Sequence, residues 1–190
     1  RFGVPAVLAA ILGALALGYL VQMDAAMSVQ VDESEVSRVT PVKLVIGLMM
    51  IGFALFELLP RFNNLEFDRR YLPLGGLLSG FFGGLSGHQG ALRSAFLAKT
   101  GLTTERFVGS NAVIGFLVDL TRIAVYVAVF AVAGTADISV WPLVIAGSLA
   151  AFVGVMVGKK FLHKVTMRSI QILVGVLLFG VGLALLLGVL

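Results

Sequence analysis

The residues best suited to bind a small anion lie in one glycine-rich run of the sequence. Between residues 73 and 99, glycine occurs at seven positions, and polar side chains gather in the second half of the run. Glycine lets the backbone leave the helical conformation. A helix that restarts near residues 87–90 would offer free N–H groups and a positive dipole end to an anion. The candidate binding residues in this run are Ser86, Gly87, His88, Gln89, Gly90, Arg93 and Ser94.

The earlier glycines of the run have two explanations, and the sequence leaves both open. Small residues spaced by four allow membrane helices to pack closely, so these glycines could serve packing as well as function. They are Gly75, Gly76, Gly80, Gly83 and Gly84. Function is favoured for residues 86–93, because His, Gln and Arg side chains at membrane depth are costly without partners. His88 is interpreted either as a neutral structural histidine or as a proton carrier.

A second polar cluster recurs with helical spacing in the segment 107–133. Its members step by four, four, three and four residues, which places them on one face of a helix. They are Asn111, Gly115, Asp119, Arg122 and Tyr126. Asp119 and Arg122 can form an ion pair, which could be architectural or functional. Asn111 and Arg122 join the candidate binding residues, and Asp119 and His88 are the candidates for proton coupling.

The composition makes the lipid bilayer the expected solvent. Hydrophobic residues make up 59% of the chain and charged residues 13%, and the mean hydropathy is +1.05. The basic residues lie between apolar runs, which favours topology signals over nucleic-acid binding. The sequence has no cysteine, which excludes disulfides, thiolate metal sites and covalent sulfur chemistry on the protein. Recognisable enzyme motifs are also absent, so we expect no enzyme, no cofactor and no metal site.

Five apolar segments are near the length of a membrane-spanning helix. They are residues 2–21, 42–59, 107–133, 140–157 and 169–190. The linker after residue 157 is rich in lysine and arginine, and the positive-inside rule places it in the cytoplasm. Counting back from this linker puts both flanks of residues 73–99 on the cytoplasmic side. The sequence therefore predicts an all-α polytopic transmembrane helical bundle that contains a glycine-broken re-entrant hairpin.

Two pairs of segments resemble each other at constant offsets. Residues 5–14 match residues 142–151 at an offset of 137, and residues 47–55 match residues 175–183 at an offset of 128. The assigned orientations of the two copies are opposite, as in inverted repeats, although Leu, Val and Gly also coincide by chance in membrane helices. We interpret residues 1–190 as one transporter domain. Residues 1–59 form the closing helix pair of the first repeat, and residues 73–190 form the second repeat. The first repeat's own hairpin and adjoining span are expected upstream of Arg1.

The glycine-rich run carries a family resemblance. Residues 76–96, together with Thr103-Thr104-Glu105-Arg106-Phe107 and Asp119-Leu-Thr-Arg122-Ile-Ala-Val-Tyr126, resemble the sulfite exporter TauE/SafE family of membrane permeases. The likeness corresponds to the C-terminal three quarters of a member. It implies a transporter with two related halves that moves sulfite, organosulfonates or similar small anions.

The sequence as a whole predicts a multi-pass protein of the cytoplasmic (inner) membrane. Its predicted function is secondary transport of small anions by alternating access. The expected partners are the anion and the lipid bilayer, with no nucleic acid, and a homo-oligomer is left open. Two other functions remain as alternatives. One is a passive anion channel, and the other is a membrane scaffold in which the polar residues only hold helices together.

Overall fold

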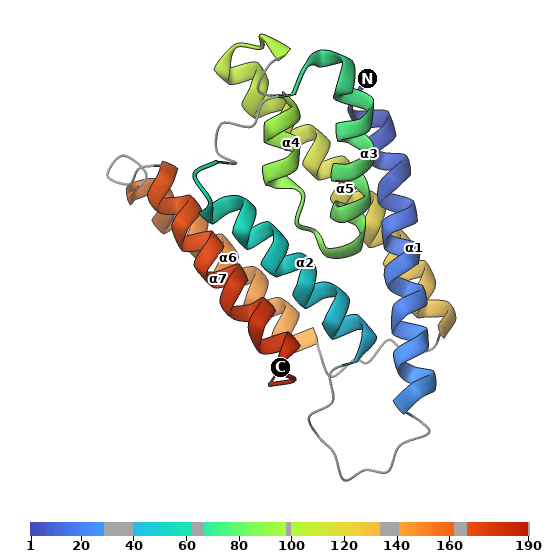
Figure 1. Ribbon diagram of the computed structural model, residues 1–190. Coiled ribbons are helices and arrows are strands. Elements are labelled where there is room, and N and C mark those ends of the chain that lie inside the picture. Colours follow the sequence, from blue (N-terminus) through green and yellow to red (C-terminus); the bar gives the residue numbers. More distant parts are fainter. Residues whose placement is uncertain (29–39, 62–66, 98–99, 134–140, 162–166, 190) are drawn as a thin grey trace.

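The computed structural model describes residues 1–28, 40–61, 67–97, 100–133, 141–161 and 167–189, and every regular element within these ranges is a helix (Figure 1). This confirms the prediction of an all-α membrane protein. The elements are α1 (Gly3–Ser28), α2 (Pro41–Leu58), η1 (Arg69–Tyr71), α3 (Leu72–Ser86), α4 (Gly90–Leu97), α5 (Thr104–Ala133), α6 (Trp141–Phe161) and α7 (Met167–Leu186).

Four helices of the described chain, α1, α2, α5 and α6, are long and apolar enough to cross a membrane. The fifth predicted span differs from expectation, because the apolar part of α7 is confined to Gln171–Leu186. The first turn of α7 is polar, since it contains Arg168 and Ser169. The 20 residues of α7 are nevertheless about 30 Å long in total, which is the thickness of the hydrocarbon layer. Helix α1 continues past residue 21 to Ser28, because no glycine or proline interrupts its last turns.

Helices α3 and α4 form the hairpin that the sequence predicts. They contain 15 and 8 residues, so neither is long enough to cross the bilayer alone. The backbone N–H of Phe67, which precedes α3, donates to the carbonyl of Ala95 near the end of α4 at 3.4 Å. The rings of Phe67 and Phe96 stack with centroids 4.2 Å apart. The two outer ends of the hairpin therefore lie at one level, and the chain turns back between them (Figure 1).

Helix α3 packs against α1 along a row of glycines. A Cβ atom built on any of three glycines would collide with a backbone carbonyl of α1. The three pairs are Gly76 with Phe2, Gly80 with Ala6, and Gly84 with Ala10. The constant difference of 74 shows that the two helices run parallel in register. For these glycines the structure supports the packing explanation.

The same register sets the depth of the hairpin turn. Gly84 lies against Ala10, and the backbone of Leu85 lies against Gly13. Gly13 is ten residues beyond the start of α1, or about 15 Å along its axis. Because the hydrocarbon layer is roughly 30 Å thick, the turn after α3 lies near the middle of the bilayer.

The other main helix pair, α2 and α7, crosses with internal symmetry. Gly47 of α2 lies against Gly182 and Leu186, and Gly175 of α7 lies against Ala54 and Leu58. Adding 128 to residues 47, 54 and 58 gives residues 175, 182 and 186, so the two sets of contacts exchange under the offset found in the sequence. The helices are antiparallel, and a two-fold axis across them relates one to the other. This is the geometry that inverted repeats require.

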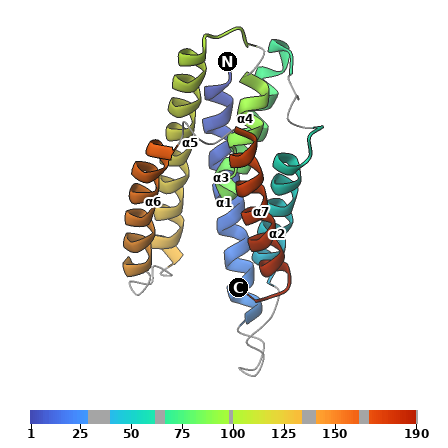
Figure 2. The ribbon, with the colours of Figure 1, turned by 90° about the vertical axis from the view of Figure 1, so that its left-hand side faces the viewer.

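Basic residues collect at one end of the bundle, where α1, α3 and α5 begin (Figure 1). They are Arg1, Arg61, Arg69, Arg70, Arg106 and Arg168. The opposite end has Asp24 and Lys43, and the carboxylate of Asp24 accepts the N–H of Val42 at 3.4 Å. This basic end is the one that the positive-inside rule predicts to face the cytoplasm. In Figure 2, α6 lies away from α2 and α7, and all its residues from 141 to 158 are exposed.

Candidate functional site

The polar face of α5 lies against the hairpin. Going down α5, Asn111 and Gly115 meet α4, Arg122 meets the turn between α3 and α4, and Tyr126 meets the end of α3. The helical spacing read from the sequence therefore brings these residues to the glycine-broken segment. The site is built from one continuous helix and the inner ends of two short helices.

Arg93 is the cation of the α4 side. Its Nε donates to Oδ1 of Asn111, and Nδ2 of Asn111 donates to Oγ of Ser94 at 3.2 Å. Arg93, Asn111 and Ser94, three of the candidate binding residues, thus form one network of side chains. The Nη1 atom of Arg93 is buried and has no hydrogen-bond partner in the described chain. A buried donor without an acceptor is costly, so this atom is open to an acceptor from outside the described chain.

Arg122 is the cation of the turn. Its Nε donates to Oδ1 of Asp119 at 2.9 Å, which is the predicted i,i+3 ion pair. Gly87 has a φ of 80°, and a Cβ on it would lie 2.8 Å from Nη1 of Arg122. Glycine is required at residue 87 on both counts, because the left-handed conformation and the close guanidinium each disfavour a side chain.

The two inner helix ends differ in how their backbone groups are satisfied. The carbonyls of residues 82–85, near the end of α3, have donors: Phe82 from Ser86 Oγ at 3.2 Å, Gly83 from Gly87 N at 2.9 Å, and Gly84 and Leu85 from the Tyr126 hydroxyl, whose one O–H they share. At the start of α4, the first such bond is from Arg93 N to Gln89 O, at 3.0 Å. The preceding N–H groups, those of Gly90, Ala91 and Leu92, have no acceptor within the described residues, as expected for a helix N-terminus. The negative helix end is therefore capped, and the positive end is left open.

Gln89 adds a buried acceptor beside these donors. Its side chain is 4% exposed, and its Oε1 has no donor among the described residues. The backbone carbonyl of Gln89 accepts Ser79 Oγ at 3.5 Å. A Cβ on Gly83 would lie 2.8 Å from Oε1 of Gln89, so Gly83 makes room for this side chain rather than for α1.

His88 and Ser86 face another helix. The Nδ1 atom of His88 lies 3.4 Å from Oγ of Ser86, and the imidazole stacks on Phe53 of α2 with centroids 6.2 Å apart. Phe53 also meets Phe82 edge to face at 5.6 Å. The structure therefore places His88 at the junction with α2, whereas Asp119 and Arg122 are on α5. Gly90 has open space where its Cβ would be.

Sequence reasoning did not select Phe53, Ser79 or Tyr126 as site residues. Tyr126 had a signal, since it continues the helical spacing of the polar face of α5. Ser79 and Phe53 had none that separates them from other small or apolar residues of membrane helices. Both acquire their roles only through the packing of the hairpin against itself and against α2.

The electrostatics of the site favour an anion. Two guanidinium groups, those of Arg93 and Arg122, face one carboxylate, that of Asp119. The open N-terminus of α4 adds a further partial positive charge. In the part of the chain that the structure describes, no cluster of three His, Asp or Glu residues could hold a metal ion.

Long apolar helices and a half-depth hairpin define the chain as an integral multi-pass membrane protein. The family model described as "Sulfite exporter TauE/SafE" matches residues 1–185, and the chain belongs to this family of membrane transporters. A search of curated proteins and a search of solved structures found no significant match.

Proposed function

We propose that the protein is a secondary transporter that moves sulfite, organosulfonates or related sulfur oxyanions across the cytoplasmic membrane by alternating access. The observation that carries the proposal is the group of unsatisfied donors at the hairpin turn. They are the N–H groups of residues 90–92 and Nη1 of Arg93. Unpaired donors near the middle of a bilayer require an acceptor, and an oxyanion supplies several within a small volume.

Each residue of the site has a role in this proposal. The free N–H groups of α4 and Nη1 of Arg93 hold the oxygen atoms of the anion. Asn111 and Ser94 keep the guanidinium of Arg93 in place through the hydrogen bonds described above. Arg122 provides the second positive charge beside Gly87. The donors lie within about one helical turn, which suits a small anion.

The buried Oε1 of Gln89 narrows the substrate class. It is an acceptor without a donor, so a fully deprotonated anion would leave it unsatisfied. An anion that also carries an O–H or N–H group would satisfy the acceptor and the neighbouring donors together. Hydrogensulfite has such an O–H group, and an aminosulfonate such as taurine has N–H groups.

The packing of the helices supports alternating access. Helices α1, α3, α4 and α5 contact one another, and α2 packs chiefly on α7. The hairpin turn meets α2 through the stacked rings of His88 and Phe53. A rocking motion of α2 and α7 against the first group would open the site to one side of the membrane at a time. A proton on Asp119 would weaken its bond to Arg122, which gives one route for coupling to a proton gradient.

Flux measurements test the proposal. The full-length protein is reconstituted in proteoliposomes, and uptake of radiolabelled sulfite and taurine is measured for Arg93→Gln and Arg122→Gln. Arg70→Gln is the matched control, because Arg70 is a largely exposed arginine at the basic end. We expect loss of flux in both site variants and normal flux in the control. Unchanged uptake in both site variants would contradict the proposal. A flux that does not change when a proton gradient is imposed would favour a passive anion channel.

A scaffold is the second candidate, and one observation favours it. Arg93, Asn111 and Ser94 join α4 to α5 by side-chain hydrogen bonds, which would also hold helices together without any substrate. Equilibrium binding of radiolabelled sulfite and taurine to the purified protein separates the two functions. A transporter shows saturable binding that Arg93→Gln weakens, whereas a scaffold shows none.

A further inference from the structure

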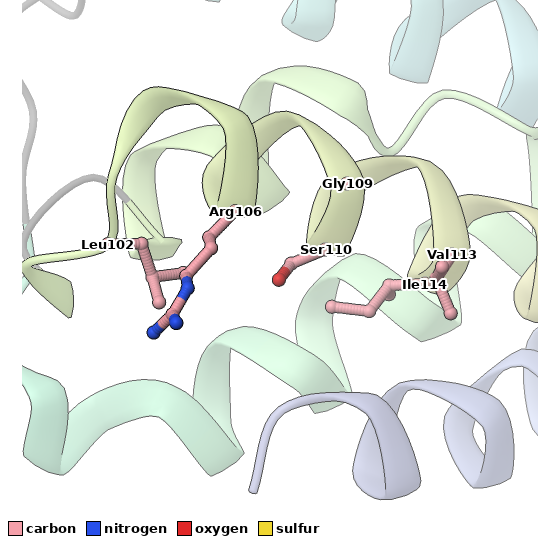
Figure 3. A pocket seen from close by; sticks show the side chains of 6 residues that line it. All are labelled: Leu102, Arg106, Gly109, Ser110, Val113 and Ile114. Atoms are coloured by element: carbon pink, nitrogen blue, oxygen red, sulfur yellow. The ribbon is translucent and has the colours of Figure 1, made fainter.

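A shallow, open cavity lies along the first turns of α5. It has a volume of about 510 Å³ and is lined by Leu102, Arg106, Gly109, Ser110, Val113 and Ile114 (Figure 3). Arg106 and Asn111 are five residues apart, which turns their side chains about 140° from each other around the helix. The cavity therefore opens on a different face of α5 from the site that holds Arg93.

The lining of the cavity changes from polar to apolar along α5. Arg106 and Ser110 lie nearest the start of the helix, at the basic end of the bundle, and Val113 follows one turn further on. The same face continues through Leu117 and Leu120, because the steps from Arg106 are four, three, four and three residues. Val113, Leu117 and Leu120 are 59%, 41% and 54% exposed, so no described helix covers this face.

The guanidinium of Arg106 has no carboxylate within ion-pair distance among the described residues. Figure 3 shows its side chain and that of Ser110 directed into the cavity. An arginine and a hydroxyl group together bind a phosphate through charge-assisted hydrogen bonds.

From this charge complementarity we infer that the cavity binds an anionic glycerophospholipid of the leaflet at the basic end, with the phosphate on Arg106 and Ser110. One acyl chain follows the face formed by Val113, Leu117 and Leu120. The distance along α5 from Arg106 to Leu117 is about 16 Å, close to the depth of one leaflet of hydrocarbon. A soluble anion would contact only Arg106 and Ser110. It would not contact the apolar face formed by Val113, Leu117 and Leu120.

The test is lipid binding by the full-length protein in a nonionic detergent, measured by native mass spectrometry. Phosphatidylglycerol and phosphatidylcholine are titrated separately. We expect Arg106→Gln to weaken binding of phosphatidylglycerol about fivefold, which is the contribution of one basic residue near an anionic surface. Binding of phosphatidylcholine should weaken less, because its choline cation offsets the charge of the phosphate. Arg70→Gln removes the same charge from the same end of the bundle outside the cavity, and should change neither affinity.

A second variant tests the cavity itself. Gly109 has open space where a Cβ would be, so Gly109→Leu can fill the cavity without disturbing α5. It should weaken binding of both lipids, because it fills the head-group end of the cavity, between Arg106 and Val113, and keeps Arg106. Equal losses in Arg106→Gln and Arg70→Gln would overturn the inference, as would unchanged binding in Gly109→Leu. Displacement of phosphatidylglycerol by millimolar inorganic phosphate would show that the occupant is a soluble anion, which also overturns it.

Discussion

Gly115 of α5 lies directly against the guanidinium of Arg93 on α4, so that a Cβ on residue 115 would come within 2.8 Å of Nη1. This contact lets the Nε of the arginine reach Asn111 and still leaves Nη1 free for a ligand. Residue 115 thus controls the position of a group that it does not bond. A substitution at Gly115 therefore tests the role of Arg93 in anion binding without changing the charge of the site.

We expect Gly115→Ala to weaken anion binding about tenfold, since the displaced guanidinium loses a charge-assisted hydrogen bond to Asn111. Alanine should not harm the helix, because it is the better helix former. The measurement is equilibrium binding of radiolabelled sulfite to the purified protein. Gly147→Ala on the exposed helix α6 is the matched control, since Gly147 has open space around its Cβ position. Equal affinities in the two variants would contradict the role of Gly115.

Close packing of α3 on α1 predicts an effect on stability. Gly80→Leu places a side chain against the backbone of Ala6, where nothing flexible can move aside. Overpacking of this kind destabilises a protein by about 1–3 kcal/mol, and backbone contact places this variant at the upper end. Thermal unfolding in detergent measures the change. Gly52→Leu is the control, because Gly52 meets nothing within 4 Å. A melting temperature equal to that of the control would mean that α1 and α3 are not in contact.

The Asp119–Arg122 pair predicts a change in coupling. Asp119→Asn removes the group that can gain and lose a proton, and keeps a hydrogen-bond acceptor for Arg122 at 2.9 Å. We expect the variant to bind sulfite but to transport it without response to an imposed proton gradient. Proteoliposome flux with and without the gradient measures this. Asp68→Asn is the control, since Asp68 faces Arg70 in an exposed pair at the basic end. A variant that still responds to the gradient would exclude Asp119 as the coupling group.

The elements of this site differ in how far the sequence predicts them. The face of α5 that bears Asn111, Asp119 and Tyr126 follows from spacing alone, because hydrogen bonding along the backbone fixes the helical period. The hairpin follows from glycine content and from the charge of its flanks. The sequence does not predict which segment each glycine of α3 packs against. Gly80 meets α1 and Gly83 meets Gln89, although they are three residues apart, because that choice depends on packing between distant segments.

The repeat shows the same limit. The offset of 128 was visible in the sequence, and it reappears as paired contacts of Gly47 and Gly175 across α2 and α7. The contact of Phe53 with His88 had no signal, since a phenylalanine in an apolar helix is ordinary. Periodic and local features are predictable because they repeat along one chain segment. A single contact between two segments is not.

The contact between Phe53 and His88 joins the hairpin turn to α2. If α2 and α7 move against the other helices during transport, this stacked pair must separate and form again in each cycle. Phe53→Ala should therefore change the maximal rate of sulfite flux and leave the substrate concentration at half-maximal flux nearly unchanged. The loss of the ring contacts with His88 and Phe82 should lower the free energy of unfolding by about 0.5–1.5 kcal/mol. This loss comes in addition to the contribution of the apolar area that the ring buries.

Phe116→Ala is the matched control for this prediction. Phe116 is 66% exposed on α5, so the substitution removes a ring of the same size from an exposed surface of the described chain. Its rate and half-saturation should both stay normal. A parallel rise of the half-saturation concentration in Phe53→Ala would assign Phe53 to binding instead of movement. A normal rate in Phe53→Ala would show that α2 does not move against the hairpin turn in the rate-limiting step.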